Sequence, residues 1–452
     1  MQLRKVQFTP ALQIFAYCAL GILFLLAIAL RISLFHIQTS DYNVFLSQWY
    51  DFIQSHGGFA ALKYNFSNYN VPYLYLLALT TYLPVPKLIA IKSLSVVFDI
   101  VLGLFTYLIV NLKYKRSLAA AIGALVVLFA PTIFINSSAW GQCDAIYTAF
   151  CLGSLYFLLK ERPAWACVFF GLALSFKLQA IFFLPVLLVL VLRKKLPLKH
   201  FVLIPASFLL MLLPAFIAGR DALSLLTIYA GQINTGGMGV GALGAFNNGG
   251  AQPFNGGNRG HFNGGNPGSF RGGNPGGFNG GGQGAGGVSS SSLTYNAPTF
   301  YQWLPAGAPE YWKWIGIGLA ILIVLGVGVL VWRSKKQLTP GVIVKIALVF
   351  ALLIPFLLPE MHERYFYLAD VISIIYAFYF PRYFFVAIIM QLCSLLSYAP
   401  YMLQTQVINL AYVAIAVLLI GVFTLADLVL TLRSRSEEVV QRPTAAYLET
   451  RS

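Results

Sequence analysis

Charged side chains are scarce in this chain. They make up 10% of its 452 residues, whereas soluble domains carry roughly 25%. Hydrophobic residues make up 58%, and apolar runs of about 20 residues, which are typical of membrane-spanning helices, recur along most of the length. The composition therefore excludes an ordinary soluble domain and predicts an all-α, polytopic integral membrane protein.

Acidic residues are rarer than basic ones. The chain has 14 Asp and Glu against 30 Lys and Arg, which gives a net charge of +16. This excess suggests nucleic-acid binding, but most basic residues lie in short clusters between apolar runs, as the positive-inside rule expects of cytoplasmic loops. We therefore expect no nucleic-acid partner, and the clusters orient the chain in the bilayer.

Paired cysteines are also lacking. The five cysteines form no CxxC pair and no metal-ligand spacing, and they are Cys18, Cys143, Cys151, Cys167 and Cys393. All lie in or beside apolar runs, so we expect buried apolar side chains and no disulfide framework.

The apolar runs predict about twelve membrane helices. The first, from Ala11 to Phe35, is longer than the apolar core of a signal peptide and has no clear cleavage site. The predicted spans are 11–35, 87–111, 117–136, 145–160, 163–176, 178–192, 201–218, 311–332, 340–358, 367–380, 383–398 and 407–432. Every basic cluster and both termini then fall on the cytoplasmic side. A thirteenth span at 72–84 would move Lys113 to Arg116 outside, so this short, Pro-flanked run is predicted to be a re-entrant or interfacial helix.

These spans divide the chain into four parts. A first membrane module covers 1–219 and contains a long first external loop, 36–86, with juxtamembrane helices. An external segment covers 220–310, C-terminal membrane helices cover 311–432, and a cytoplasmic tail covers 433–452. Within the external segment, 235–288 is built from near-repeats of Gly, Asn, Phe and Pro. It has too few apolar side chains to offset the entropy of ordering, and we expect it to be disordered.

With this topology, the unusual polar residues collect at the outer helix ends. They are Asp41, Gln142, Asp144, Lys177, Gln179, His362, Glu363 and Arg364. Ionisable groups at the edge of the hydrocarbon are costly and usually pair or mark a site. Lys and Arg can hold a phosphate, and a carboxylate can take a proton from an attacking hydroxyl. The set therefore indicates a reaction on an anionic substrate at the outer leaflet.

Each of these residues also has a simpler interpretation. Asp41 and Asp144 can be helix N-caps, Lys177 can extend its ammonium to the interface, and the run 362–364 can be a structural ion-pair cluster. We expect hydrogen bonds between helices, rather than chemistry, for Asp99, Asp370 and Asp427, and structural or interfacial roles for Lys87, Lys92 and Lys345.

Four sequence blocks resemble GT-C glycosyltransferases in their order along the chain. The blocks are Asp41-Tyr42 with Trp49 and Tyr69-Asn70-Val71-Pro72, then Trp140-Gly141-Gln142-Cys143-Asp144, then Phe176-Lys177-Leu178-Gln179, then His362-Glu363-Arg364-Tyr365. The resemblance is to the glucosyltransferases of N-glycan precursor assembly and to the bacterial group related to GPI-anchor mannosyltransferases. In that bacterial group, Tyr295-Asn296-Ala297-Pro298 is similar to the segment before the later helices. Val71, where relatives often have a second proline, and the Gly-rich insert depart from the pattern.

The resemblance implies inverting transfer of mannose or glucose from a polyprenyl-phosphate donor to an external acceptor, which is a lipid-linked glycan, a protein or a polysaccharide. It implies Asp41 as the general base, Asp144 and Gln142 for acceptor or metal, and Lys177, His362 and Arg364 for the donor phosphate. Supporting residues are Tyr42, Gln179, Glu363 and Tyr365. Metal use stays open, with Mg²⁺ or Mn²⁺ as the candidate cofactor. The prokaryotic resemblance suggests a bacterial plasma membrane with the active site on its external face.

Two other classes of function remain open. A lipid-linked sugar transporter, or flippase, requires polar residues along a path across the membrane, and Asp99, Asp370 and Lys345 are its support. A non-enzymatic scaffold would display the Gly-rich insert. Deletion of 235–288 would abolish the function of a scaffold and leave sugar transfer largely intact.

Overall fold

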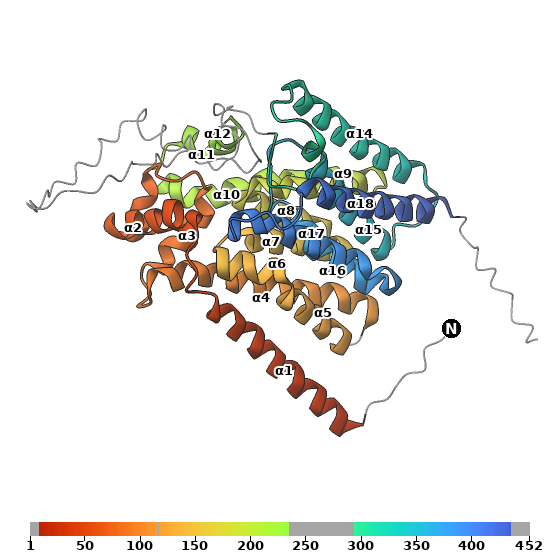
Figure 1. Ribbon diagram of the computed structural model, residues 1–452, viewed down its shortest axis with the longest axis horizontal. Coiled ribbons are helices and arrows are strands. Elements are labelled where there is room, and N and C mark those ends of the chain that lie inside the picture. The colour runs from red at the N-terminus through yellow and green to blue at the C-terminus, as the bar shows by residue number, and fades with distance from the viewer. Residues whose placement is uncertain (1–8, 116, 235–292, 435–452) are drawn as a thin grey trace, which may run out of the picture.

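The computed structural model describes residues 9–115, 117–234 and 293–434. These residues form helices and one small two-stranded parallel sheet, β1 (Thr294–Tyr295) and β2 (Met361–His362) (Figure 1). The α-helices are α1 (Pro10–Ser33), α2 (Ser47–Ser55), α3 (Val71–Thr80), α4 (Lys87–Tyr114), α5 (Ser117–Phe129), α6 (Pro131–Phe134), α7 (Asp144–Leu159), α8 (Pro163–Phe176), α9 (Leu184–Leu192), α10 (Leu203–Ile217), α11 (Ala222–Leu226), α12 (Ile228–Asn234), α14 (Tyr311–Arg333), α15 (Pro340–Leu357), α16 (Tyr367–Tyr379), α17 (Phe385–Met402) and α18 (Leu410–Arg433). The short 3₁₀ and π helices are η1 (Tyr42–Leu46), η2 (Gly58–Lys63), η3 (Ile135–Trp140), η4 (Leu178–Phe183), η5 (Leu198–Val202), η6 (Phe300–Trp303) and η7 (Pro381–Tyr383). The all-α prediction is confirmed.

Capping side chains start several of the long helices. Thr9 Oγ1 accepts a hydrogen bond from the N–H of Leu12, and Thr339 Oγ1 accepts one from Val342, both at 3.4 Å. A proline follows each threonine, where its missing N–H costs nothing. Local sequence thus fixes where α1 and α15 begin.

In the described part of the chain, seven helices are long and apolar enough to cross a membrane: α1, α4, η5 with α10, α14, α15, η7 with α17, and α18. The pair α5 and α6–η3, bent by 53° at its break, makes an eighth candidate. The other predicted spans correspond to shorter apolar helices, α7, α8, η4 with α9, and α16. The polytopic prediction is confirmed, and α3 is the short helix predicted at 72–84. The insert 235–288 and all but the first two residues of the predicted tail lie outside the described residues.

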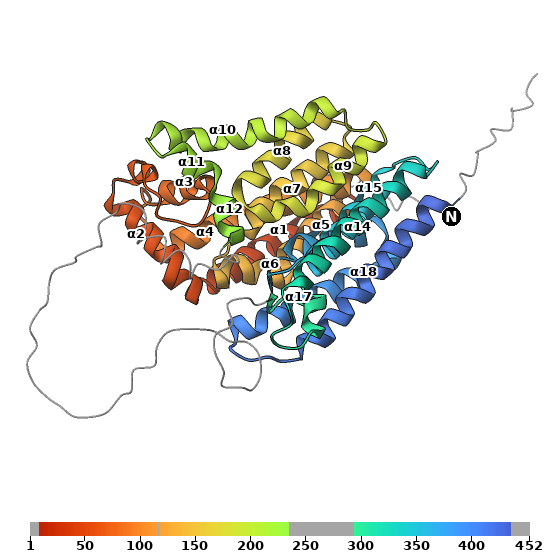
Figure 2. The same ribbon diagram turned by 90° about the horizontal axis from the view of Figure 1, so that it is seen from above.

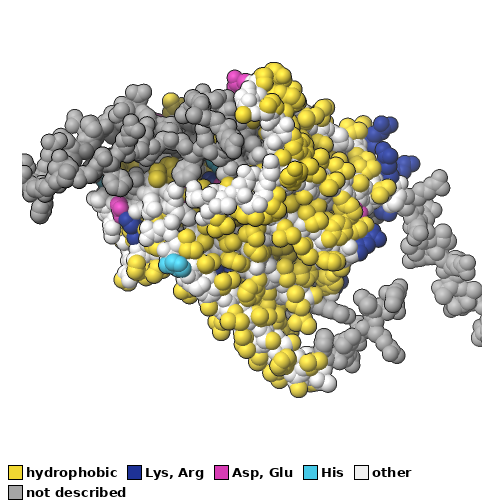
Figure 3. Space-filling model, viewed as in Figure 1, with side chains coloured by type: hydrophobic (Ala, Val, Ile, Leu, Met, Phe, Trp, Pro, Cys, Tyr) yellow, Lys and Arg dark blue, Asp and Glu magenta, His cyan; other side chains and the backbone are white. Residues whose placement is uncertain are grey.

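Loops of the same predicted side lie together. Arg193 donates hydrogen bonds to the carbonyls of Ser334 and Lys336, at 2.8 and 3.0 Å, and Lys195 pairs with Glu161 at 2.8 Å. Figure 3 shows Lys and Arg gathered at the end of the molecule opposite α2 and α3. The short helices α2 and α3 occupy the other end, where α2 packs on α3 and α3 packs on α10 (Figure 2). Which end faces the cytoplasm stays a prediction.

The close packing of α8 on α10 gives a first testable expectation. A Cβ at Gly171 would lie 2.6 Å from the carbonyl oxygen of Ile204 and 2.6 Å from Ser207 Oγ. A backbone oxygen cannot move aside cheaply, so Gly171→Ala is expected to destabilise the protein by about 1–3 kcal/mol. Gly318→Ala, on an open face of α14, should leave stability unchanged or raise it. Thermal unfolding in detergent measures both, and equal midpoints for the two variants would refute the packing argument.

Candidate active site

Asp41 lies between the end of α1 and the start of η1 and is partly buried. Its Oδ2 accepts hydrogen bonds from Trp140 Nε1, at 2.9 Å, and from Gln142 Nε2. Its backbone N–H donates to Tyr401 Oη at 2.9 Å. The carboxylate makes no helix-capping bond, so the N-cap interpretation of Asp41 is wrong. Trp140 and Gln142 both donate to Oδ2, and neither donates to Oδ1.

The partners of Asp41 are themselves fixed. Gln142 Oε1 accepts a hydrogen bond from Tyr69 Oη at 3.2 Å, and the carbonyl of Gln142 accepts one from Ser95 Oγ at 2.6 Å. Gly141 has a φ of +81°, a left-handed conformation that glycine adopts without strain. This turn ends η3 and allows both Trp140 and Gln142 to reach the same carboxylate oxygen.

Asp144, at the start of α7, is fully buried. Its Oδ2 accepts a hydrogen bond from Asn136 Nδ2 at 2.9 Å, and its Oδ1 pairs with Lys177 Nζ. Cys143 holds the N-cap position, and the carboxylate bonds side chains instead of the helix, so the cap interpretation of Asp144 is also wrong.

Lys177 lies where the chain breaks between α8 and η4. Its backbone is extended, with φ −153° and ψ 136°, and this turns the side chain inward. Only 9% of the residue is exposed. Burial lowers the pKa of Lys177, but the neighbouring Asp144 carboxylate outweighs it, and the net pKa is raised. The ammonium therefore stays charged inside the site and does not extend to the interface.

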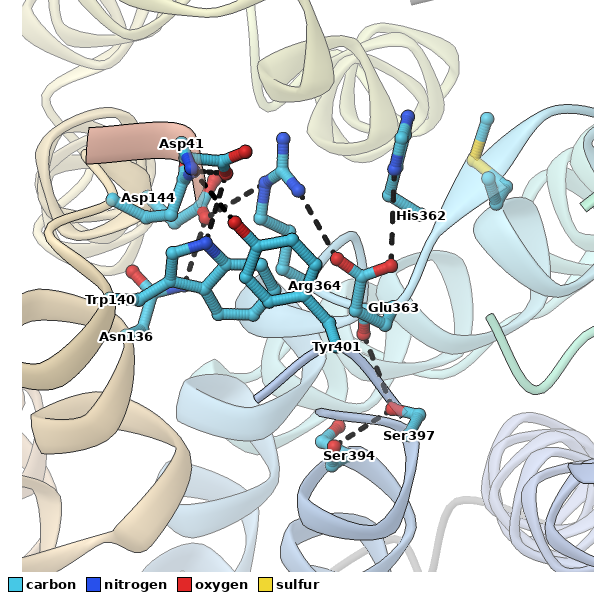
Figure 4. A network of polar contacts seen from close by, with 12 residues as sticks. Asp41, Asn136, Trp140, Asp144, His362, Glu363, Arg364, Ser394, Ser397 and Tyr401 are labelled. Carbon is cyan, nitrogen blue, oxygen red and sulfur yellow. Dashed lines mark hydrogen bonds and ion pairs between the residues drawn. The ribbon is translucent and has the colours of Figure 1, made fainter. Parts of the chain in front are cut away.

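The loop between α15 and α16 supplies the third part of the site (Figure 4). Arg364 Nη1 donates to Glu363 Oε1 at 3.2 Å, and Arg364 Nε lies 3.8 Å from Asp144 Oδ2. The Arg364 guanidinium carbon also lies 5.4 Å from the ring centroid of Trp140. Arg364 thus joins the Asp144–Lys177 pair to the Asp41 side of the site.

His362 is held by the small sheet. Its ring stacks on Tyr295, with centroids 4.8 Å apart and planes 19° from parallel, because β1 pairs with β2 at this residue. His362 Nδ1 lies 3.9 Å from Glu363 Oε2, and its buried Nε2 makes no hydrogen bond to any residue that the structure describes. The segment that carries β1 thus orients a candidate site residue.

Burial changes the charge of two of these groups. It raises the pKa of Glu363 to about 7, although Arg364 opposes the shift. Burial, together with the nearby Arg364 and Lys177, lowers the pKa of His362 well below its usual range, so the imidazole is neutral. Two cations therefore face Asp41, Asp144 and Glu363, and the protonation of Glu363 decides whether the site is neutral or carries one negative charge.

The remaining predicted residues are less central. Tyr365 flanks the site, with its ring 5.2 Å from that of His362 and 5.8 Å from the Arg364 guanidinium carbon. Tyr42 is buried in the apolar core. Gln179 buries an Oε1 that has no hydrogen bond partner. The structure therefore brings seven predicted residues into one network and leaves Tyr42 and Gln179 outside its hydrogen bonds; the seven are Asp41, Gln142, Asp144, Lys177, His362, Glu363 and Arg364.

Sequence reasoning missed some members of the site. Tyr401, on α17, stacks on Trp140 with centroids 4.4 Å apart, and Asn136 orients Asp144. Trp140 and Tyr69 are part of the sequence blocks, but nothing in the pattern assigned them a contact. Tyr401 lies in an apolar run and carries no local signal that could have identified it.

The acids within the helices lie in separate networks. Asp99 pairs with Arg31 at 2.8 Å, Asp370 accepts a hydrogen bond from Ser394 at 2.7 Å, and Asp427 pairs with Lys345 at 2.7 Å. The prediction of hydrogen bonds between helices is confirmed. Within residues 9–115, 117–234 and 293–434, no group of three or more His, Cys, Asp or Glu side chains is placed to hold a metal ion.

Comparison with known proteins adds one finding. Residues 66–235, less than half of the chain, match the model of glycosyltransferase family 87. The matched segment contains Gln142, Asp144 and Lys177, while Asp41 and the loop 362–364 lie outside it. A search of curated proteins finds no match. The family match indicates a membrane glycosyltransferase.

Proposed function

We propose that this membrane glycosyltransferase moves mannose or glucose from a polyprenyl-phosphate donor to an extracytoplasmic acceptor with inversion. The observation that carries the proposal is Asp41, whose hydrogen bonds from Trp140 and Gln142 both go to Oδ2, beside the buried cations Lys177 and Arg364. A carboxylate next to paired cations suits a reaction that moves a proton at one point and develops negative charge at another. The match to glycosyltransferase family 87 supports the class of reaction.

In the proposed reaction, an acceptor hydroxyl oxygen attacks the anomeric carbon of the donor sugar. Its proton passes to Asp41 Oδ1 as the new carbon–oxygen bond forms. The bond between the anomeric carbon and the phosphate oxygen breaks, and polyprenyl phosphate leaves with both electrons of that bond. A single displacement of this kind inverts the anomeric centre.

The leaving phosphate gains one negative charge as the bond breaks. Lys177 and Arg364 stabilise this charge in a site screened from water, where electrostatic stabilisation is strongest. His362 is neutral, and its Nε2 is free to bond a phosphate oxygen. Asp144 holds Lys177 in place, and Gln142 orients Asp41. The acceptor is a lipid-linked glycan, a protein or a polysaccharide, and Mg²⁺ or Mn²⁺ remains the candidate cofactor.

The proposed location follows from the charge of the loops at the two ends of the molecule. The loops that contain Arg193, Lys195 and Lys336 are basic, and the positive-inside rule assigns them to the cytoplasm. The site then opens to the external face of a bacterial plasma membrane, and both termini are cytoplasmic.

A turnover assay in proteoliposomes tests the proposed function. The purified protein is given polyprenyl phosphates that carry labelled mannose or glucose, and the release of polyprenyl phosphate is measured. We expect one of the two donors to be cleaved. A flippase would carry the labelled donor across the bilayer with its sugar–phosphate bond intact, and that result would replace the proposal with the transporter.

Glu363 predicts a pH dependence of donor binding. Its pKa is raised to about 7 by burial, so it gains negative charge near the phosphate site as the pH rises from 6 to 8. A polyprenyl-phosphate sugar is a phosphodiester and does not titrate in this range. The donor KM is therefore expected to rise several-fold between pH 6 and pH 8 in the wild type and to stay nearly constant in Glu363→Gln. An equal rise in both proteins would show that another group titrates.

A further inference from the structure

Lys92, on α4, is a fully buried ammonium, and no carboxylate of the described part of the chain forms an ion pair with it. Four backbone carbonyls surround its Nζ instead. Their residues, with their oxygen distances, are Ile37 at 2.5 Å, Ala139 at 3.0 Å, Phe35 at 3.2 Å and Leu34 at 3.4 Å. A buried charge requires strong partners, so this arrangement is specific.

The four carbonyls come from the ends of two helices. Leu34 is the C-cap of α1, with Phe35 and Ile37 directly after it, and Ala139 lies in the last turn of η3. Helix C-termini carry partial negative charge and unpaired carbonyls, which a lysine ammonium can satisfy. Lys92 therefore connects the end of α1 to the end of η3.

Both connected segments lead to the carboxylate of Asp41. One of them reaches Asp41 four residues after Ile37. The other continues from Ala139 to Trp140 and Gln142, which donate the two hydrogen bonds to Asp41 Oδ2. The position of one segment against the other thus decides where this carboxylate lies.

Two more residues of α4 support the same alignment. Ser95 Oγ donates to the carbonyl of Gln142 at 2.6 Å. Asp99 Oδ2 accepts hydrogen bonds from Arg31, in the last turn of α1, at 2.8 Å and from Ser137, in η3, at 2.6 Å. Lys92, Ser95 and Asp99 are spaced i, i+3 and i+7, so they share one face of the helix.

We propose that Lys92 is a positioning residue of the transferase: by bridging the carbonyls that end α1 and η3, it places the Asp41 carboxylate for proton transfer. This inference rests on the proposed function. Within the described residues, the hydrogen bonds of the Lys92 ammonium go to these four carbonyls and not to Lys177, His362 or Arg364, which lie at the α8–η4 break and in the α15–α16 loop. Its loss should therefore affect the proton transfer and leave donor binding intact.

The test compares Lys92→Met with Lys345→Met in lipid. Lys345 is another buried lysine of a membrane helix, paired with Asp427 and Thr431 far from the site, so it controls for the loss of a buried charge. We expect Lys92→Met to lower kcat about 10- to 100-fold with the donor KM within twofold of wild type. Lys345→Met should keep wild-type kcat per folded molecule. Lys92→Arg, which retains the cation, should keep more kcat than Lys92→Met.

A double-mutant cycle with Asp41→Asn separates positioning from a general structural role. If Lys92 acts through Asp41, adding Lys92→Met to Asp41→Asn should change the residual rate less than twofold. The proposal would be overturned if Lys92→Met lowered the rate of Asp41→Asn by the same factor as it lowers the wild-type rate. It would also be overturned if Lys92→Met raised the donor KM and left kcat unchanged. If Lys92→Met does not fold, Ser95→Ala provides the same test, with a few-fold loss of kcat, unchanged KM and no further loss in the Asp41→Asn background.

The cycle also separates this inference from the proposed function. Full activity in Asp41→Asn would reject the catalytic base itself. An inactive Asp41→Asn beside a fully active Lys92→Met would reject only the positioning role.

Discussion

Asp41→Asn is expected to lower kcat by about 10²- to 10⁴-fold, the range that a positioned general base contributes. The side chain keeps its size, and its amide oxygen can still accept the hydrogen bonds from Trp140 and Gln142. An amide cannot take up the acceptor proton, so the chemical step is lost while the fold stays. The donor KM should change little, because the phosphate partners are unaltered. Release of polyprenyl phosphate from a labelled donor measures both constants.

Asp51→Asn is the matched control for this change. Asp51 lies on α2 in the same loop, 36–86, its side chain is 57% exposed, and it pairs with Lys87 at 2.8 Å. Surface ion pairs contribute little, so this variant should insert, fold and turn over like the wild type. Wild-type kcat in a correctly inserted Asp41→Asn protein would refute the catalytic assignment.

Lys177→Met is expected to lower kcat by about 10²- to 10³-fold, the typical loss when one group that stabilises transition-state charge is removed. The change also removes the closer of the two cations beside the buried Asp144 and leaves only Arg364, 3.8 Å away, which should cost about 3–5 kcal/mol of stability. A low rate alone would therefore be ambiguous, and thermal unfolding has to be measured beside turnover.

The double variant Lys177→Met/Asp144→Asn resolves this ambiguity. It removes both charges of the pair, so the thermal midpoint should recover towards wild type while kcat stays low. Lys87→Met removes a lysine at the start of α4 whose side chain is 31% exposed, and it should have no effect on either quantity. Recovery of activity in the double variant would mean that Lys177 only neutralises Asp144 and does not act on the donor phosphate.

Much of the fold was predictable because a bilayer imposes a simple rule on sequence. Each apolar run had to become a helix, since its backbone groups have no water to bond. The convergence of Asp41, Lys177 and Arg364 followed from the predicted topology, because that topology places these charges at helix ends on one side and therefore at one membrane depth. The sequence therefore predicted which distant residues meet without any information on their contacts.

The detailed contacts were not predictable, because they depend on packing between distant segments. The stacking of Tyr401 on Trp140 requires α17 to meet η3, and the pairing of Tyr295 with His362 joins residues 67 positions apart. The role of Lys92 illustrates the same limit. A lysine in an apolar run indicates an interfacial or structural side chain, and its four carbonyl partners appear only once α1 and η3 are placed.

The most direct test of a single displacement with Asp41 as base is the anomeric configuration of the product. The wild-type protein in lipid receives whichever donor it cleaves in the turnover assay, with a defined anomeric configuration, and methanol as a small acceptor. The anomeric configuration of the methyl glycoside is then determined by NMR. A product anomer opposite to that of the donor is the predicted result. Retention of the donor configuration would contradict the mechanism, because a single back-side displacement inverts the anomeric centre.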